Sequence, residues 1–470
     1  MFNKFIFLIS FINAFFKNKS ENYFYIKFNN FISADILTYF NFNMKNKQNL
    51  TFPFEINLNY YPICLNQPKY NSILDRYKIS IAYYKHNIGI IGGREILSFL
   101  HFKNFLKYPF IDLYLFGCNN NISKLPFYIK SINFCNKKNS KNKIKNAIQF
   151  FKKYSIDIFF GNEYEINLCK YIKKLNIKTI QLYHNHFFSF NYLKKKYNSG
   201  NFHKIYRCAS VLITLIPNNR ILWEKSGIKF CTYLPNPTTF NPNEIEVSNL
   251  KYKNILMLGR CATIKRYEIG INAMKYVIKK EPDAKLYIVG ICNDNYGNYL
   301  KNYINKLGLK NNIIFNKLVK NTKIYYKNAS IFLLTSKFEG CPMTLTESKL
   351  YGLPTIVIGM NYLSYAKNGV ININTEDPKL IANEILKLLS DKKYRELEGK
   401  KARQSLNDFS NEEIYKRWIE LFIAVKQGDK IIEKYINKYD IYDKEKDFKE
   451  NEILYKKIFN NNLKNFKEFI

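Results

Sequence analysis

The stretch that decides the fold runs from Ile331 to Gly359 and reads IFLLTSKFEGCPMTLTESKLYGLPTIVIG. Its first four residues, Ile331 to Leu334, form an apolar run of the length expected for a buried parallel strand. A loop follows, a helix is predicted to open near Pro342, and Thr355 to Ile358 form a second apolar strand. The stretch therefore predicts a unit of two parallel strands joined by a helix.

Two glutamates stand in this unit. Glu339 lies in the loop directly before Gly340, and Glu347 lies eight residues further on, inside the predicted helix. This spacing does not suit two carboxylates that share a proton, but it suits two acceptors that hold different parts of one elongated ligand beside anion-binding helix amides. Sugar nucleotides have that shape. The alternative is an ordinary unit of this kind whose glutamates only solvate a helix end.

The residues from Phe338 to Val357, FEGCPMTLTESKLYGLPTIV, carry a family resemblance. They resemble the motif of two glutamates separated by seven residues in the retaining, group 1 (family four) glycosyltransferases of GT-B fold. The resemblance is strong from 254 to 358, loose before 240, and extends over about 78 to 425. It implies an α/β fold in which two Rossmann-like, doubly wound parallel-sheet domains face a central cleft.

Composition limits the classes of function. The 470 residues are enough for two domains and a tail, and a hydrophobic content of 47% can fill a sizeable core. A formal charge of +37 raises the possibility of a nucleic-acid binder. Because Lys, Asn, Ile, Phe and Tyr are all abundant, we interpret the charge as a solvated surface from an A/T-rich genome and expect no nucleic acid. Its sum would still attract an anionic membrane or substrate.

The cysteines and the first residues bear on localisation. Nine cysteines are scattered without a close pair, which is typical of reduced thiols in a cytoplasmic protein. The apolar run from Phe5 to Phe16 is too short to span a bilayer. It is interpreted as a buried strand or helix of an extension, with a membrane-surface anchor as the alternative. The expected location is cytoplasmic, with contact at the inner face of the membrane left open.

The first predicted domain opens with a strand from Lys78 to Tyr84 and a glycine-bearing turn. Gly92 and Gly93 let the backbone come close to a ligand, although a double glycine is also common in plain turns. The turn resembles the first loop of the acceptor domain in the family, with Glu95 as its glutamate; Arg94 departs from the usual form. The resemblance therefore places Gly92 and Gly93 among the donor-binding residues.

Further strands are predicted at 111–116, 156–160 and 179–183, with helices at about 144–154 and 163–174. Alternating strands and helices predict a parallel sheet whose ligand crevice lies outside the carboxyl ends of its strands. His184 and His186 stand at such an end, where a histidine is often only packed or solvated. The resemblance favours His184 as the residue that reaches the donor sugar.

The second predicted domain follows a proline-rich linker, Thr232 to Pro242, and the boundary is placed near 247. A strand from Asn254 delivers Gly259 and Arg260 at its carboxyl end, and Lys265 precedes a helix. Two cations at the mouth of a parallel sheet suit a diphosphate, because arginine makes a forked contact and lysine adds a point charge. The resemblance assigns both to the leaving diphosphate.

Five segments are predicted along the chain. The helix Asn411 to Phe422 is amphipathic, with Ile414 and Trp418 on its apolar stripe, and by resemblance it crosses back to the first domain. The segments are an extension of unknown role (1–77), an acceptor-side domain (78–246), a donor-nucleotide domain (247–409), the crossing helix (410–425) and a charged tail (426–470).

The resemblance also assigns chemistry to the central unit. Glu347 is expected to hold the ribose hydroxyls and Glu339 the hydroxyls of the transferred sugar. The first amides of the helix, at Met343, Thr344 and Leu345 beyond Gly340, are expected to bind the diphosphate. No Asp-x-Asp stands at a strand end, so we expect metal independence and no cofactor. The predicted catalytic residues are Glu339, His184, Arg260 and Lys265.

The expected function is transfer of a hexose-type sugar, with retention, from a nucleotide diphospho-sugar. A UDP-sugar is the first expectation, with a saccharide or lipid-linked acceptor in surface polysaccharide or glycolipid assembly. The alternatives are a GT-B-like phosphorylase or epimerase, and a non-catalytic sugar-nucleotide-binding module of the same fold. A nucleic-acid binder is motivated by charge alone. Neither the donor base nor the oligomeric state follows from the sequence.

Overall fold

The computed structural model places all of its described residues in one compact unit, Lys69–Ile470. The extension, the apolar run near the start, Gly92 and the side chains of Arg94 and Glu95 lie outside the described part of the chain. The structure describes residues 78–85, 93–108, 110–117, 130–133, 140–161, 171–189, 206–291, 294–317, 319, 321–360, 362–439 and 444–459.

The first sheet is parallel and doubly wound. Its strands lie in the order β3-β2-β1-β4-β5-β6-β7, so the order reverses between β1 and β4. Ile81 pairs with Leu113 of one neighbour and Ile158 of the other, and all three side chains are buried. The strands are β1 (Ile79–Lys85), β2 (Ile111–Gly117), β3 (Lys130–Asn133), β4 (Ile158–Gly161), β5 (Lys178–Tyr183), β6 (Val211–Thr214) and β7 (Cys231–Tyr233).

Helices cover this sheet on both faces, which explains its near-continuous apolar strands. They are α4 (Gly93–Phe105), α5 (Ser140–Lys153) and α9 (Asn219–Lys225), with a short turn η4 (Lys173–Leu175) before β5. The helix predicted at about 144–154 is α5, whereas the one predicted at 163–174 lies mostly outside the described residues. The short strands β3 and β7 were not predicted from the sequence, and the nearby prolines, Pro235 and Pro237, hid β7.

The second sheet repeats the design. Its order is β10-β9-β8-β11-β12-β13, and every pair is parallel. The two apolar strands of the opening motif are neighbours, with Phe332 of the first paired to Thr355 of the second. The strands are β8 (Asn254–Leu258), β9 (Lys285–Ile291), β10 (Ile313–Lys317), β11 (Ile331–Leu334), β12 (Thr355–Ile358) and β13 (Ile371–Ile373). The predicted α/β class with two doubly wound parallel sheets is therefore confirmed.

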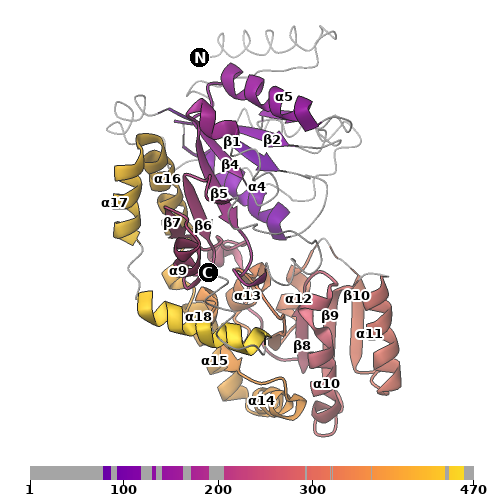
Figure 1. Cartoon of the computed structure of the whole chain (residues 1–470). Helices are drawn as coiled ribbons and strands as arrows, with labels where there is room; N and C mark the ends of the chain where they lie inside the picture. Colours follow the sequence, from indigo (N-terminus) through magenta and orange to yellow (C-terminus); the bar gives the residue numbers. More distant parts are fainter. Residues whose placement is uncertain are drawn as a thin grey trace, which may run out of the picture. The chain divides into compact units, whose positions relative to one another are not determined.

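Two helices of the second sheet begin at an aspartate that caps their first turn. Asp294 accepts the amide of Gly297 to start α11, and Asp377 precedes the proline that opens α14. Figure 1 shows α10 and α11 beside β8, β9 and β10 in the orange and pink part of the chain. The helices are α10 (Tyr267–Val277), α11 (Asn295–Lys306), α12 (Lys323–Lys327), α13 (Met343–Leu350), α14 (Pro378–Ser390) and α15 (Lys392–Gln404).

Helix α16 (Asn411–Gln427) packs against the first sheet although it follows the second in sequence. Trp418 lies 5.1 Å from the ring of His101 on α4 and 5.3 Å from that of Phe160 on β4, measured between ring centroids. Figure 1 shows α16 and α17 (Asp429–Tyr439), in gold, beside the strands of the first sheet. The last described helix, α18 (Lys444–Phe459), contacts α9.

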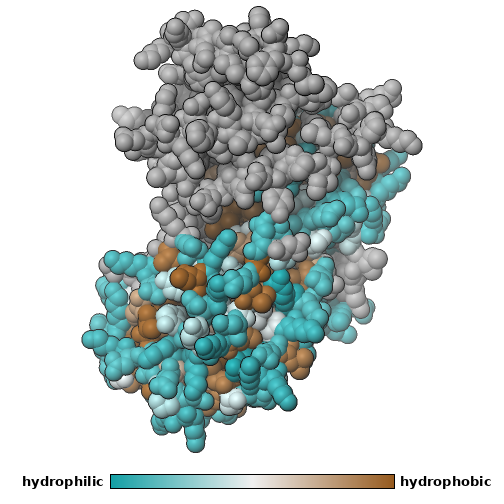
Figure 2. Space-filling view, turned by 180° about the vertical axis from the view of Figure 1, so that it is seen from behind, coloured by the Kyte–Doolittle hydropathy of each residue, from teal (hydrophilic) through white to brown (hydrophobic). Residues whose placement is uncertain are grey.

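The face of the molecule that Figure 2 shows is mostly polar where it is described. In Figure 2, hydrophilic side chains cover most of the coloured face, and the hydrophobic ones are scattered between them. No helix in the described ranges has both the length and the apolar content to span a bilayer. Of the described cysteines, Cys231, Cys261 and Cys341 are buried and Cys208 is half-buried.

Candidate functional site

The site is built at the point where the order of the second sheet reverses. β8 and β11 are neighbours there, and the loops that leave their carboxyl ends lie side by side. We call them the arginine-lysine loop (Gly259–Arg266) and the glutamate loop (Thr335–Gly340). In an open parallel sheet, such a reversal is where a crevice for ligands forms. The sheet topology therefore brings the predicted cations and the first predicted carboxylate to one edge.

The two loops meet in an ion pair. Lys265 Nζ lies 2.6 Å from Glu339 Oε1, and the two side chains are 19% and 15% exposed. Gly259 makes room for this pair, because a Cβ at that position would lie 3.3 Å from Lys265 Cε. Arg260, the next residue, is exposed. A lysine and a glutamate that face each other at a partly open edge can each take up a new partner when a ligand enters.

Backbone hydrogen bonds hold the glutamate loop in place. The amide of Glu339 donates to the hydroxyl of Tyr362 at 3.0 Å, and the amide of Lys337 donates to the carbonyl of Ile264 at 2.8 Å. Burial raises the pKa of Tyr362 well above its ordinary value, so its hydroxyl stays neutral. Glu339 is therefore carried by a loop that is fixed from both sides.

Gly340 is where the glutamate loop touches the first domain. An added Cβ at this position would lie 1.8 Å from the carbonyl oxygen of His184, directly after β5. Only a residue without a side chain fits between the two backbones. A second close approach joins Gly93, at the start of α4, to Met343, whose Sδ would lie 3.4 Å from an added Cβ. These contacts bring His184 and Gly93 to the same edge as Glu339.

The first turn of α13 has the features of an anion-binding helix end. Pro342 caps the helix without a side-chain hydrogen bond. The amide of Leu345 donates to the carbonyl of Pro342 at 3.1 Å, so it is already bonded within the chain. Of the three predicted amides, those of Met343 and Thr344 therefore stay open to a ligand. The hydroxyl oxygen of Thr344 is also buried and has no hydrogen-bond partner among the described residues. A ligand oxygen at this turn would supply that partner.

Glu347 lies one turn further along α13 and is 6% exposed. Its Oε1 accepts a hydrogen bond from Thr239 at 2.8 Å, and its Oε2 accepts one from Tyr326 at 2.7 Å. Burial raises the pKa of Glu347, and the two hydrogen bonds oppose that shift. The carboxylate is thus preorganised by two hydroxyls, one from α12 and one from the linker between the domains. Glu347 has no hydrogen bond to Lys265 or Glu339, which bond each other.

The two histidines after β5 differ in environment. His184 is partly exposed, and its backbone lies against Gly340. His186 is fully buried, and burial lowers its pKa to about 3. Its Nδ1 accepts the amide of Phe188 at 3.1 Å, so Nε2 carries the proton, and its ring packs against that of Tyr362. His186 is a neutral packed side chain, whereas His184 is exposed enough to meet a ligand.

The linker between the two sheets is hydrogen-bonded to the segment before α13, to Tyr365 and to the start of α16. Asn236 Nδ2 donates to the carbonyl of Cys341 at 3.0 Å, while its own carbonyl accepts the hydroxyl of Tyr365 at 2.6 Å. Burial raises the pKa of the Cys341 thiol to about 12, so this thiol is no nucleophile at neutral pH. Asn411, at the start of α16, bonds the backbone of Thr238 in both directions.

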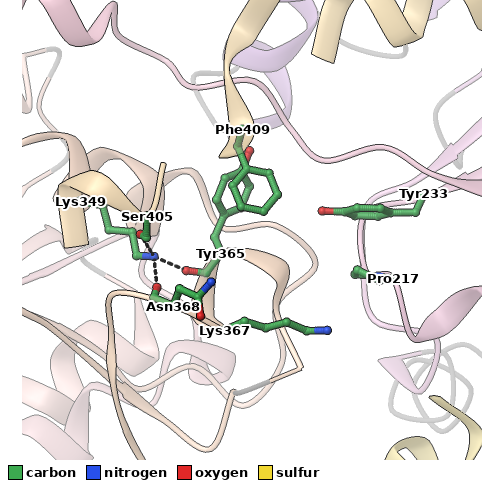
Figure 3. A pocket seen from close by; sticks show the side chains of 8 residues that line it. All are labelled: Pro217, Tyr233, Lys349, Tyr365, Lys367, Asn368, Ser405 and Phe409. Atoms are coloured by element: carbon green, nitrogen blue, oxygen red, sulfur yellow. Dashed lines mark hydrogen bonds between the residues drawn. The ribbon is translucent and has the colours of Figure 1, made fainter. Parts of the chain in front are cut away.

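A separate pocket of about 190 Å³ lies near the linker and contains none of the predicted site residues. Figure 3 shows the ammonium of Lys349 bonded to the carbonyls of Tyr365 and Asn368 and to the hydroxyl of Ser405. Burial lowers the pKa of Lys349 to about 7. With all three donors taken by the protein, Lys349 fastens α13 to its neighbours. The pocket is lined by Pro217, Tyr233, Lys349, Tyr365, Lys367, Asn368, Ser405 and Phe409.

The structure thus brings most predicted residues to one edge, through measured contacts that join Gly259, Lys265, Glu339, Gly340 and His184. Gly93 reaches the same edge through Met343. Sequence reasoning missed the residues that hydrogen-bond these site residues or the loops that carry them. They carried no motif signal, since each is an ordinary polar residue whose partner is distant in sequence. They are Asn236, Thr239, Arg266, Tyr326 and Tyr362.

Comparison with known proteins matches the second domain to a family. Residues 241–405 match the family model of the glycosyl transferases group 1. An uncharacterized glycosyltransferase of Haemophilus influenzae is 23% identical over 360 residues, which are 72% of this chain and 98% of that protein. The alpha-monoglucosyldiacylglycerol synthase of Streptococcus pneumoniae is 27% identical over 248 residues, or 46% of this chain and 55% of that protein.

A solved structure shares the fold. The crystal structure of Anabaena HepE in complex with UDP-glucose superposes with a TM-score of 0.61 at 14% identity. The match covers 73% of this chain and 99% of that chain. The two-sheet architecture of this chain is therefore the GT-B fold that the motif implied.

Proposed function

Because the chain belongs to the group 1 glycosyltransferases, we propose that it transfers a hexose-type sugar from a nucleoside diphospho-sugar to a hydroxyl acceptor, with retention of the anomeric configuration. The observation that carries this proposal is the ion pair of Lys265 and Glu339 at the reversal point of the second sheet, 2.6 Å long and partly open. A cation there suits a leaving diphosphate, and a carboxylate there suits sugar hydroxyls.

The donor diphosphate would lie at the first turn of α13. The amides of Met343 and Thr344 and the unpartnered Thr344 hydroxyl supply donors, and the helix dipole adds about 0.3–1 kcal/mol for each such contact. Arg260, the exposed residue directly after Gly259, would add a forked contact. Glu347, held by Thr239 and Tyr326, would accept the ribose hydroxyls.

Lys265 and Glu339 would exchange each other for parts of the donor when it binds. When the donor enters, Lys265 would turn from Glu339 to the diphosphate, and Glu339 would accept hydroxyls of the sugar. Charge on the diphosphate grows as the glycosidic bond breaks, so Lys265 would stabilise the transition state more than the bound donor. The acceptor hydroxyl would approach from the first domain, beside His184, with its proton passing to the departing diphosphate.

The donor and acceptor classes rest on the relatives. HepE was solved with UDP-glucose, and the Streptococcus pneumoniae relative is named as a synthase of a glucosylated diacylglycerol. A UDP-hexose donor and a saccharide or lipid-linked acceptor are therefore proposed, in surface polysaccharide or glycolipid assembly. Contact with an anionic membrane is proposed from the charge of +37. Arg260 and Lys265 would take the place of a metal cation.

The test is nucleoside diphosphate release by the full chain. It is incubated with UDP-, GDP- and ADP-hexoses and a panel of saccharide and glycolipid acceptors, with excess chelator in a parallel set. We expect nucleoside diphosphate to be released from one of the donors, at a rate that chelator does not lower. The product, examined by NMR, should have the same anomeric configuration as the donor sugar. Complete loss in chelator that magnesium restores would refute metal independence. An inverted anomer would refute retention, and binding without release would favour the non-catalytic module.

A further inference from the structure

Arg266 occupies an unusual backbone position directly after Lys265. Its φ of 49° and ψ of 51° are left-handed, a region that side-chain-bearing residues rarely adopt. It ends the short turn η6 (Thr263–Lys265) and starts α10, and no side chain caps that helix start. The direction in which Lys265 leaves the backbone depends on this reversal, because the two residues share a peptide bond.

The side chain of Arg266 reaches across to the glutamate loop. Its Nε donates to the carbonyl of Thr335 at 2.9 Å, and its Nη2 donates to the carbonyl of Ser336 at 3.2 Å. In return, Thr335 Oγ1 donates to the carbonyls of Lys265 and Arg266, at 2.7 Å and 3.0 Å. Nη1 is paired with Glu376, whose side chain is 63% exposed. One guanidinium thus binds two consecutive carbonyls of the loop that carries Glu339.

We propose that Arg266 is a positioning residue that fixes the ammonium of Lys265 and the carboxylate of Glu339 relative to each other. The effect of this positioning on catalysis rests on the proposed function. The planar guanidinium matches two carbonyls that are adjacent in sequence, which an ammonium cannot do with one fixed geometry. The same bonds stabilise the left-handed backbone at Arg266, a conformation that a glycine would adopt without strain. Arg266 contributes through Lys265 and Glu339 and makes no contact with the reacting atoms itself.

Three variants separate this role from simple stability. Arg266→Gly keeps the left-handed backbone accessible and removes the guanidinium. Arg266→Lys keeps the charge and the aliphatic stem but loses the forked contact. Glu376→Gln is the matched control, because it removes the charge of the exposed partner of Arg266 and leaves both loop bonds intact. Each variant is assayed as the full chain for kcat, donor KM and thermal midpoint.

We expect Arg266→Gly and Arg266→Lys to lower kcat about 30- to 100-fold with donor KM changed less than about threefold, since misplacement near 1 Å costs about a hundredfold. Glu376→Gln should stay within about twofold of the wild type. Guanidinium ion at low millimolar concentration should restore part of the turnover of Arg266→Gly and none of that of Lys265→Ala.

Two results would overturn the inference. One is wild-type kcat in folded Arg266→Gly, and the other is a lowered thermal midpoint with unchanged kcat for the folded fraction of Arg266→Lys. If Arg266→Gly does not fold, the kcat and thermal midpoint of Arg266→Lys decide. A wild-type chain that turns over no donor would instead refute the proposed function. In that case nucleoside diphosphate binding by the same variants still tests the arrangement, because a displaced Lys265 weakens binding of the free diphosphate, which carries more negative charge than its sugar ester.

Discussion

Replacing Gly340 by alanine tests the contact between the two domains at the site. The added methyl group would lie 1.8 Å from the carbonyl oxygen of His184 and 2.7 Å from its carbonyl carbon, whereas side-chain carbons keep at least 3.0 Å from such atoms. The obstructing atoms are backbone, so no side-chain rotation relieves the clash. The glutamate loop or the segment after β5 must therefore move, and Glu339 with it.

The expected size follows from that displacement. Inserting one methyl group into a packed backbone contact costs about 1–3 kcal/mol of unfolding free energy. A displacement of Glu339 by about 1 Å should lower kcat/KM about a hundredfold. The assay combines urea unfolding with donor turnover under identical buffer conditions.

The matched control is Gly308→Ala, after α11. Its φ of 69° is left-handed, but an added Cβ meets no atom within 4 Å. It should lose about 1 kcal/mol from backbone strain alone and keep its turnover. If Gly340→Ala matched this control in both stability and turnover, the close approach of Gly340 to His184 would be refuted.

Three further predictions concern Lys265, Glu347 and the tyrosine bonded to Glu347. Lys265→Ala should lower kcat about 10²- to 10³-fold while donor affinity changes far less, because charge on the leaving group grows toward the transition state. Steady-state kinetics measures kcat, and titration measures donor affinity. Equal losses in kcat and in donor affinity would contradict this prediction. Glu347→Gln should raise the thermal midpoint at pH 7 and weaken donor binding. The gain should disappear as pH falls toward the ordinary carboxyl pKa, because burial raises the pKa of Glu347 in the folded state and only its ionised form is penalised. Tyr326→Phe, which removes a hydrogen bond to the same carboxylate, should instead destabilise by about 1–3 kcal/mol.

The fold was predictable because its signals are local. Apolar runs of four to seven residues separated by helical stretches identify parallel strands, and β8, β11 and β12 begin and end close to their predicted positions. The strand β7 was missed because it is short and runs into Leu234 and Pro235, where turn signals dominate. The strand β3, four residues long, carries equally little signal.

The site was predictable where chemistry and spacing coincide in one segment. Lys265 and Glu339 were both predicted, and the reversal between β8 and β11 brings them within 2.6 Å. The supporting residues could not be predicted, because their roles depend on contacts across long stretches of chain. Tyr326 reaches Glu347 over 21 positions and Thr239 reaches it over 108. Nothing in the sequence around Arg266 indicated its left-handed backbone.

The most direct test of the central claim is calorimetric titration of the full chain with UDP, GDP and ADP, repeated on Lys265→Ala and Glu347→Gln. The account predicts that one diphosphate binds the wild type with one-to-one stoichiometry, and that both substitutions weaken its binding at least about tenfold, which corresponds to about 1.4 kcal/mol. The free diphosphate carries more negative charge than its sugar ester, so its affinity depends on Lys265 more than donor affinity does. Equal affinity in the wild type and both variants, or no binding of any of the three at millimolar concentration, would contradict it.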